Sequence, residues 1–233
     1  MMKKVISTPE KWSVFRKQLA LEMEKVGLNS VSLVIILSFF VGAVVSIQTA
    51  FNMNSPLLPS YLVGLASRDS LILEFSPTMI SLILAGKVGS SIASEIGSMR
   101  VTEQIDALEI MGINSASFLI LPKIIAAIFF FPFLITMSMG VGMIGAWVGG
   151  LSAGITTADF MYGLKYDFNS FYITYAIIKT TVFAFIISSI SAYFGYHTKG
   201  GAIAVGKAST TAVVTSSILI LLFNYILTDI ILS

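Results

Sequence analysis

The stretch that decides the fold is AGKVGSSIASEIGSMRVTEQIDALEIMGINSASFLILP, residues 85–122. It begins inside an apolar run, becomes charged after Gly97, and turns apolar again after Asn114. Runs of this kind on both sides of a short charged segment are typical of two membrane spans joined by a connection in water.

The connection itself has a helical pattern, and we expect a helix over about 99–112. Val101, Ile105 and Leu108 recur at spacings of four and three, which places them on one helical face. Glu103 lies on another face. A short helix that is apolar on one side and acidic on the other is suited to docking into another protein. The alternative is a linker helix that only lies at the membrane interface.

The composition defines the class of protein. Of the 233 residues, 56% are hydrophobic and 11% are charged, whereas soluble domains carry about 25% charged residues. We therefore expect an all-α integral membrane protein. A net charge of +2 gives no nucleic-acid footprint. The chain has no cysteine and one histidine, which argues against a metal site and leaves a membrane-embedded enzyme a weak hypothesis.

Five charge-poor runs predict five transmembrane helices in a domain of residues 29–233. One of these runs, 124–158, is longer than a bilayer core requires and allows one span or two short ones. We favour one span, because proline and glycine are tolerated inside packed membrane helices. Residues 52–69 and 152–169 are expected to be connections, with Ser76 capping the second span. The spans are expected at about 31–51, 71–97, 118–150, 171–196 and 208–228.

Residues 1–28 are expected to form an amphipathic helix in the membrane interface, with a solvated helix as the alternative. Its apolar positions recur every three or four residues, at Trp12, Phe15, Leu19, Met23 and Val26. Basic residues set the orientation. The five-span arrangement leaves only Arg68 and Lys165 on one side, opposite Lys3, Lys4, Lys11, Arg16, Lys17, Lys25, Arg100, Lys123, Lys199 and Lys207. The N-terminus and the 99–112 helix are therefore expected in the cytosol, and the C-terminus outside.

The chain carries no phosphate-binding loop of the form G-x-x-x-x-G-K-[ST]. GSMRVTEQ lacks the final lysine and hydroxyl residue, and GGAIAVGKAS ends in GKA. We expect no cofactor on this chain, so ATP and magnesium would be bound by a partner subunit. The 99–112 segment would then be a coupling helix, which transmits movement from that partner to the membrane part.

The central motif carries a resemblance to a known family. GSMRVTEQIDALEIMGI, with the preceding AGKVGSSIASEIG, closely resembles the signature of the Mla-type (maintenance of lipid asymmetry) permease family. These permeases are the membrane subunits of ABC transporters that work with mammalian-cell-entry (MCE) domain proteins. The resemblance runs from about residue 30 to the end. Further similar motifs are GAVVSIQ (42–48), LEFSP (73–77), IKTTVFA (178–184) and VGKASTTAVV (205–214).

The resemblance implies a homodimer in the bacterial inner membrane, with ABC ATPase subunits at the cytosolic face and an MCE-domain hexamer at the periplasmic face. It implies glycerophospholipid as cargo and a role in outer-membrane lipid asymmetry. A non-transporting scaffold that anchors the MCE protein and the ATPase is the alternative. The residues implied to enter the ATPase groove are Glu103, Gln104, Asp106, Leu108 and Met111.

The resemblance also implies a lipid cavity between two copies, lined by Gln48 and close to a charged pair formed by Glu74 and Lys179. Two positions depart from the family pattern. Leu73 replaces a basic residue, and Asn224 replaces a common acidic one. The apolar walls that lipid tails require could come from Val44, Ile47, Leu71, Ile72 and Phe75.

Overall fold

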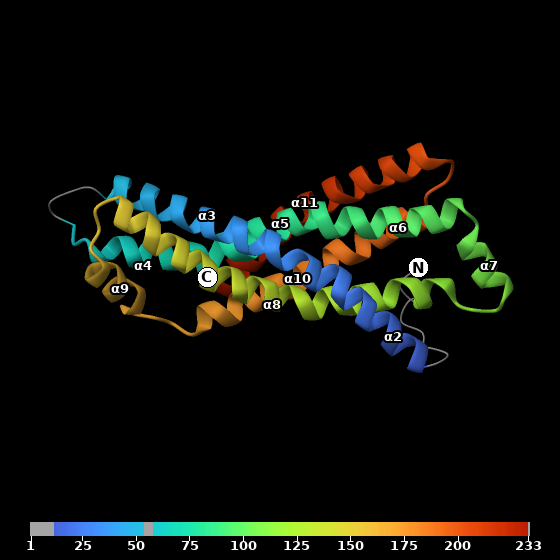
Figure 1. Cartoon of the computed structure of the whole chain (residues 1–233), viewed down its shortest axis with the longest axis horizontal. Helices are drawn as coiled ribbons and strands as arrows, with labels where there is room; N and C mark the ends of the chain where they lie inside the picture. Colours follow the sequence, from blue (N-terminus) through green and yellow to red (C-terminus); the bar gives the residue numbers. More distant parts are fainter. Residues whose placement is uncertain (1–11, 54–57, 233) are drawn as a thin grey trace. The chain divides into compact units, whose positions relative to one another are not determined.

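The structure is a computed structural model that describes residues 12–53 and 58–232. Within these residues the chain is helical and contains no strand (Figure 1). Three π-helical segments, Glu24–Leu28, Leu71–Met79 and Ala85–Gly89, join consecutive α-helices. The α-helices are α2 (Trp12–Met23), α3 (Asn29–Asn52), α4 (Tyr61–Ser70), α5 (Ile80–Leu84), α6 (Ser90–Val101), α7 (Gln104–Ile110), α8 (Ser115–Ser152), α9 (Thr157–Lys165), α10 (Phe171–Tyr196) and α11 (Ala202–Leu232).

Five helical runs in the described part of the chain are long and apolar enough to cross a membrane. This confirms the all-α, five-span prediction. The long apolar run forms the single helix α8, which passes through Gly149 and Gly150 without a break. The five runs are Trp12–Asn52, Tyr61–Val101, Ser115–Ser152, Phe171–Tyr196 and Ala202–Leu232.

The structure differs from the predicted boundaries in the connections. The helices α4 and α9 lie within segments expected to be loops. Pro77 lies inside the π-helical segment Leu71–Met79 rather than in a first turn behind a Ser76 cap. A proline has no N–H to donate, and π-type turns re-pair the backbone around it.

The predicted N-terminal helix is described from Trp12 onward, and its first eleven residues lie outside the described part. From Trp12 it continues into α3 without the expected break near residue 29, because the π-helical segment Glu24–Leu28 carries the helical path onward. Of the predicted apolar face, Val26 is buried and Trp12 is exposed. Phe15, Leu19 and Met23 are half-buried.

The predicted helix at 99–112 is shorter than expected. Helix α6 ends at Val101, and α7 begins only at Gln104. Glu103 between them has a left-handed backbone, with φ of 61°. This conformation cannot continue a right-handed helix. Gly112 follows the end of α7 with φ of 80°, which glycine adopts without steric cost.

The described chain divides into two compact units. One comprises residues 12–30, 81–131 and 181–232, and the other comprises residues 31–80 and 132–180. In the second unit, α3 and α8 approach so closely that a Cβ on Gly42 would overlap the carbonyl oxygen of Gly142. Small residues permit this backbone approach, which drives helix association in lipid. In the first unit, α6 and α11 are joined by a hydrogen bond from Ser209 Oγ to the Ser90 carbonyl oxygen at 3.0 Å.

Arg68 ties α4 to the end of α9 within the second unit. Its side chain is 2% exposed. One guanidinium nitrogen donates to the carbonyl oxygens of Leu164 at 2.9 Å and Tyr166 at 2.8 Å, and Nε donates to Asp69 at 2.8 Å. The last carbonyls of a helix have no partner within the helix. Arg68 therefore caps α9 and holds it on α4.

We expect Arg68→Ala to lower the free energy of unfolding by about 3 kcal/mol, because it removes a buried side chain and leaves two part-buried carbonyl oxygens without its donors. Arg68→Lys should lie between the wild type and the alanine variant, since an ammonium offers fewer directed donors. Thermal unfolding in detergent measures the effect. The matched control is Lys165→Ala, an exposed cation in α9 that should change stability by less than about 0.5 kcal/mol. Equal stability of the Arg68→Ala and Lys165→Ala variants would contradict this account.

Candidate functional site

The charged pair expected from the sequence is present in the second unit. Lys179 Nζ in α10 lies 2.8 Å from Glu74 Oε1 in the π-helical segment Leu71–Met79. The Lys179 side chain is fully buried, whereas that of Glu74 is 43% exposed. Thr78 donates a hydrogen bond to the other carboxylate oxygen of Glu74 at 3.0 Å. The acidic member of the pair is therefore the one that faces outward.

Lys179 has further partners that hold its ammonium in place. It donates to the carbonyl oxygen of Leu73 at 3.3 Å and lies 4.6 Å from the centre of the Tyr175 ring. Carboxylate, carbonyl and aromatic face all favour a cation. A lysine that is buried and neutralised in this way is a poor ligand for a phosphate, so the geometry favours a structural pair over a head-group contact.

The other residues expected to line a lipid cavity fall into two sets. Val44 and Ile47 on α3 are exposed, as is Gln48. Leu71 and Ile72 are only 1% and 2% exposed. The structure therefore places them in the interior of one copy of the chain. Phe75 is half-buried and packs against the core cluster that contains Leu71. The role of all six in a lipid cavity stays a prediction.

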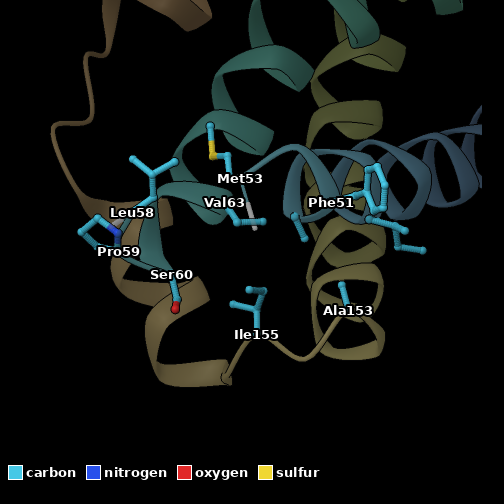
Figure 2. Close-up of a pocket in the computed structure, with 10 residues that line it drawn as sticks. Phe51, Met53, Leu58, Pro59, Ser60, Val63, Ala153 and Ile155 are labelled. Carbon is cyan, nitrogen blue, oxygen red and sulfur yellow. The ribbon is translucent and has the colours of Figure 1, made fainter. Parts of the chain in front are cut away.

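A cavity of about 370 Å³, lined mainly by apolar side chains and also by polar main-chain atoms, lies at the end of α3 (Figure 2). Its walls come from the last turns of α3, the start of α4 and the turn between α8 and α9. Among its described lining residues, Ser60 is the one whose side chain is polar. Sequence reasoning identified only Ile47 of this set, because α4 and the α8–α9 turn were expected to be unstructured. The lining residues are Ile47, Ala50, Phe51, Met53, Leu58, Pro59, Ser60, Val63, Ala153 and Ile155.

Helix α7 has a buried face and an outward face. Ile105 is fully buried, and Val101 and Leu108 are half-buried, as the apolar pattern predicted. Asp106 pairs with Arg100 of its own chain at 2.5 Å. The exposed residues include the predicted Glu103, Gln104 and Met111, together with Ala107, Glu109 and Ile110.

Ile110 is the outward residue that sequence reasoning missed. Its side chain is 87% exposed, and that of Met111 is 65% exposed. A signal for it was available, because Glu103, Ala107 and Ile110 are spaced four and three apart and so share a helical face. Ile110 and Met111 are thus two large apolar side chains exposed next to each other in the sequence.

The model of the family described as "Permease MlaE" matches residues 19–230. The chain belongs to the MlaE permease family. A probable ABC transporter permease protein of Rickettsia bellii is 38% identical to it over 231 residues, which cover 97% of this chain and 85% of the relative. A probable ABC transporter permease protein of Synechocystis is 36% identical over 207 residues, covering 88% of this chain and 78% of the relative.

A relative in Arabidopsis thaliana is the protein TRIGALACTOSYLDIACYLGLYCEROL 1, chloroplastic. It is 34% identical over 209 residues, which cover 89% of this chain and 59% of the relative. The family and these relatives make this MlaE-family chain a multi-pass permease subunit of an ABC transporter. In such a transporter the ATPase is a separate subunit.

The permease also contains a charge cluster in its first unit that sequence reasoning did not assemble. Lys123 in α8 is 3% exposed and lies 2.7 Å from both Glu22 in α2 and Glu95 in α6. Lys25 joins the cluster at 2.9 Å from Glu95. The charges of the two lysines and the two glutamates cancel. The ion pairs connect the N-terminal helical segment to α6 and α8.

We expect Lys123→Ala to destabilise the permease by about 3–5 kcal/mol, because it leaves two glutamates facing each other without the buried cation. Lys25→Ala is the matched control. Its side chain is 52% exposed, and pairs at such positions contribute less than about 1 kcal/mol. Thermal unfolding in detergent measures both. A loss for Lys123→Ala no larger than for Lys25→Ala would remove the cluster from the account.

Proposed function

We propose that this permease moves glycerophospholipids, driven by a separate ATPase, between the inner membrane and a periplasmic MCE-domain protein. In this role it maintains the lipid asymmetry of the outer membrane. The observation that carries the proposal is a cavity of about 370 Å³ whose described side chains are apolar except for Ser60, in a permease of this family. Pockets lined by apolar side chains with few polar groups suit ligands with acyl chains. The name of the Arabidopsis relative is that of a diacylglycerol lipid, which supports a glycerolipid as cargo but does not point to a phosphate head group.

The cavity and the exposed residues of α3 form one apolar region. Ile47 lines the cavity and is 44% exposed, and Val44 lies one turn before it and is 60% exposed. Gln48 is a polar neighbour on the same helix. Lipid tails would lie against Val44 and Ile47, with polar head-group atoms toward Gln48. Glu74 and Lys179 would hold their helices together beside this path.

The cytosolic partner is proposed to bind at α7, whose outward face carries Ile110 and Met111. The chain has no phosphate-binding loop, so ATP and magnesium are assigned to that partner. Ten basic residues on the α7 side of the five-span arrangement support a cytosolic position for this helix.

A second copy of the chain is proposed to pack against α11. One face of α11 lies on α6, but only 11% of its most apolar window is buried. Its exposed apolar residues include Ile218, Leu221 and Tyr225. Packing of these residues against a second copy would form the dimer, with the MCE-domain protein at the outer end.

The test is lipid transfer by the full complex in liposomes, with fluorescent phospholipid and with or without ATP. We expect transfer that requires ATP and that falls about tenfold in Ala153→Phe, which fills the cavity. The matched control is Ala158→Phe, an exposed alanine outside the cavity lining, which should transfer lipid at the wild-type rate. Transfer that is absent, or indifferent to ATP, would favour a membrane scaffold that only anchors its partners.

A further inference from the structure

Three side chains from three segments meet beside α7 in the first unit. Ser115 Oγ, at the start of α8, donates to Glu109 Oε1 at 2.8 Å. Tyr196 Oη, at the end of α10, donates to the same carboxylate oxygen at 2.8 Å. The two hydroxyl oxygens are 2.9 Å apart. Since each hydroxyl has one proton, both protons can be directed at the carboxylate, which makes Glu109 the centre of the cluster.

Arg100 connects the other end of the same segment to Tyr196. Its guanidinium carbon lies 5.9 Å from the centre of the Tyr196 ring, and its nitrogen pairs with Asp106 at 2.5 Å. A guanidinium above an aromatic face is attracted by the ring. Tyr196 is therefore in contact with the last turn of α6 through Arg100 and with the last turn of α7 through Glu109.

The backbone on each side of α7 is suited to pivoting. The left-handed residue Glu103 separates α7 from α6, and Gly112 with φ of 80° separates it from α8. A displacement of α7 is therefore not passed along the backbone through these two turns as it would be along a continuous helix. Movement of α7 therefore reaches α10 through side chains, and the described contacts place Tyr196 at that junction.

We propose that Tyr196 is a positioning residue that transmits displacement of α7 to α10 when the ATPase acts. This inference rests on the proposed function only in that α7 is taken as the surface for the ATPase. Ile110 and Met111, the proposed docking residues, are exposed. The neighbouring Glu109 carboxylate instead accepts hydrogen bonds from Ser115 and Tyr196. Helix α10 is also the helix that carries Lys179. A displacement of its end is thus applied to the same element that holds the charged pair.

The first measurement does not depend on cargo. Hydrogen exchange of the full complex is compared between the nucleotide-free and vanadate-trapped states, for wild type and Tyr196→Phe. In wild type, trapping should change exchange in α7 and in the last turns of α10. In Tyr196→Phe the change in α7 should persist, while that in α10 should fall by at least about fivefold. The matched control is Tyr193→Phe, an exposed tyrosine one turn earlier in α10, which should behave as wild type.

The second measurement is the amount of lipid moved per ATP hydrolysed. We expect this ratio to fall about tenfold in Tyr196→Phe and in Glu109→Ala, and to recover in Glu109→Gln, whose side-chain oxygen still accepts hydrogen bonds. If the Tyr196→Phe complex fails to assemble, the comparison of Glu109→Ala with Glu109→Gln still tests whether the hydrogen bonds to Glu109 are needed. Wild-type ratios and wild-type α10 exchange in Tyr196→Phe and Glu109→Ala would overturn the inference. So would loss of the nucleotide response in α7 itself, because Tyr196 would then act on docking. If the wild-type complex moves no lipid, the proposed function fails while the exchange measurement still tests Tyr196.

Discussion

Glu74→Ala is expected to lower the free energy of unfolding by about 3–5 kcal/mol and to abolish transport. The side chain of Lys179 is fully buried. In the variant its ammonium loses the Glu74 carboxylate, whose Oε1 lies 2.8 Å away in the wild type. Removing one partner of a buried pair costs this much because the remaining charge stays desolvated. Thermal unfolding in detergent and lipid transfer in liposomes measure the two effects.

The reverse change should be milder for stability. Lys179→Ala leaves Glu74, which is 43% exposed and keeps the hydrogen bond from Thr78. We expect a smaller loss of stability than for Glu74→Ala, with impaired transport. The double variant Glu74→Gln with Lys179→Met removes both charges and should be more stable than Glu74→Ala. Unchanged transport in Lys179→Ala, at normal protein levels, would remove the pair from the mechanism. Equal stability of the two alanine variants would contradict the asymmetry of burial.

Ile110→Asp combined with Met111→Asp is expected to reduce binding of the ATPase by at least about a hundredfold. These two side chains are the large exposed apolar groups at the end of α7. A carboxylate placed where an interface closes must lose its water without gaining a partner, which costs several kcal/mol. Co-purification of the ATPase and ATP hydrolysis by the complex measure the loss.

The control for this variant is Ile203→Asp. Ile203 is 80% exposed, also in the first unit, but lies in the first turn of α11 rather than in α7. It should leave ATPase binding near the wild-type level. Retention of the ATPase by the double variant, or equal loss in both variants, would mean that α7 is not the specific docking helix.

The spans were predictable because a long apolar run has few alternatives in a membrane. Helix α8 is an example: its glycines suggested a possible break, yet packing in lipid tolerates them. The short helices α4 and α9 were missed, because their polar residues resemble loop residues. The stabilising contacts of Arg68 with α9 become visible only when residues about a hundred positions apart are brought together.

The candidate site also contains residues that the sequence indicated and contacts that only the folded structure shows. Glu74 and Lys179 are 105 positions apart, and only a family resemblance suggested that they form a pair. Lys123 was counted for membrane orientation, but its contacts with Glu22 and Glu95 depend on the packing of three helices. The cavity depends on α4, which the sequence pattern did not predict. Local periodicity identifies helix faces, whereas these features arise from tertiary contacts.

The account depends most on α7 being the cytosolic helix on which the ATPase acts. The chain contains no cysteine, so Glu103→Cys introduces a single thiol at an exposed position next to α7. A membrane-impermeant maleimide should leave this thiol unlabelled in intact cells, label it after permeabilisation, and label it more slowly when the ATPase is bound. Labelling in intact cells would place the helix on the outer side and contradict the account.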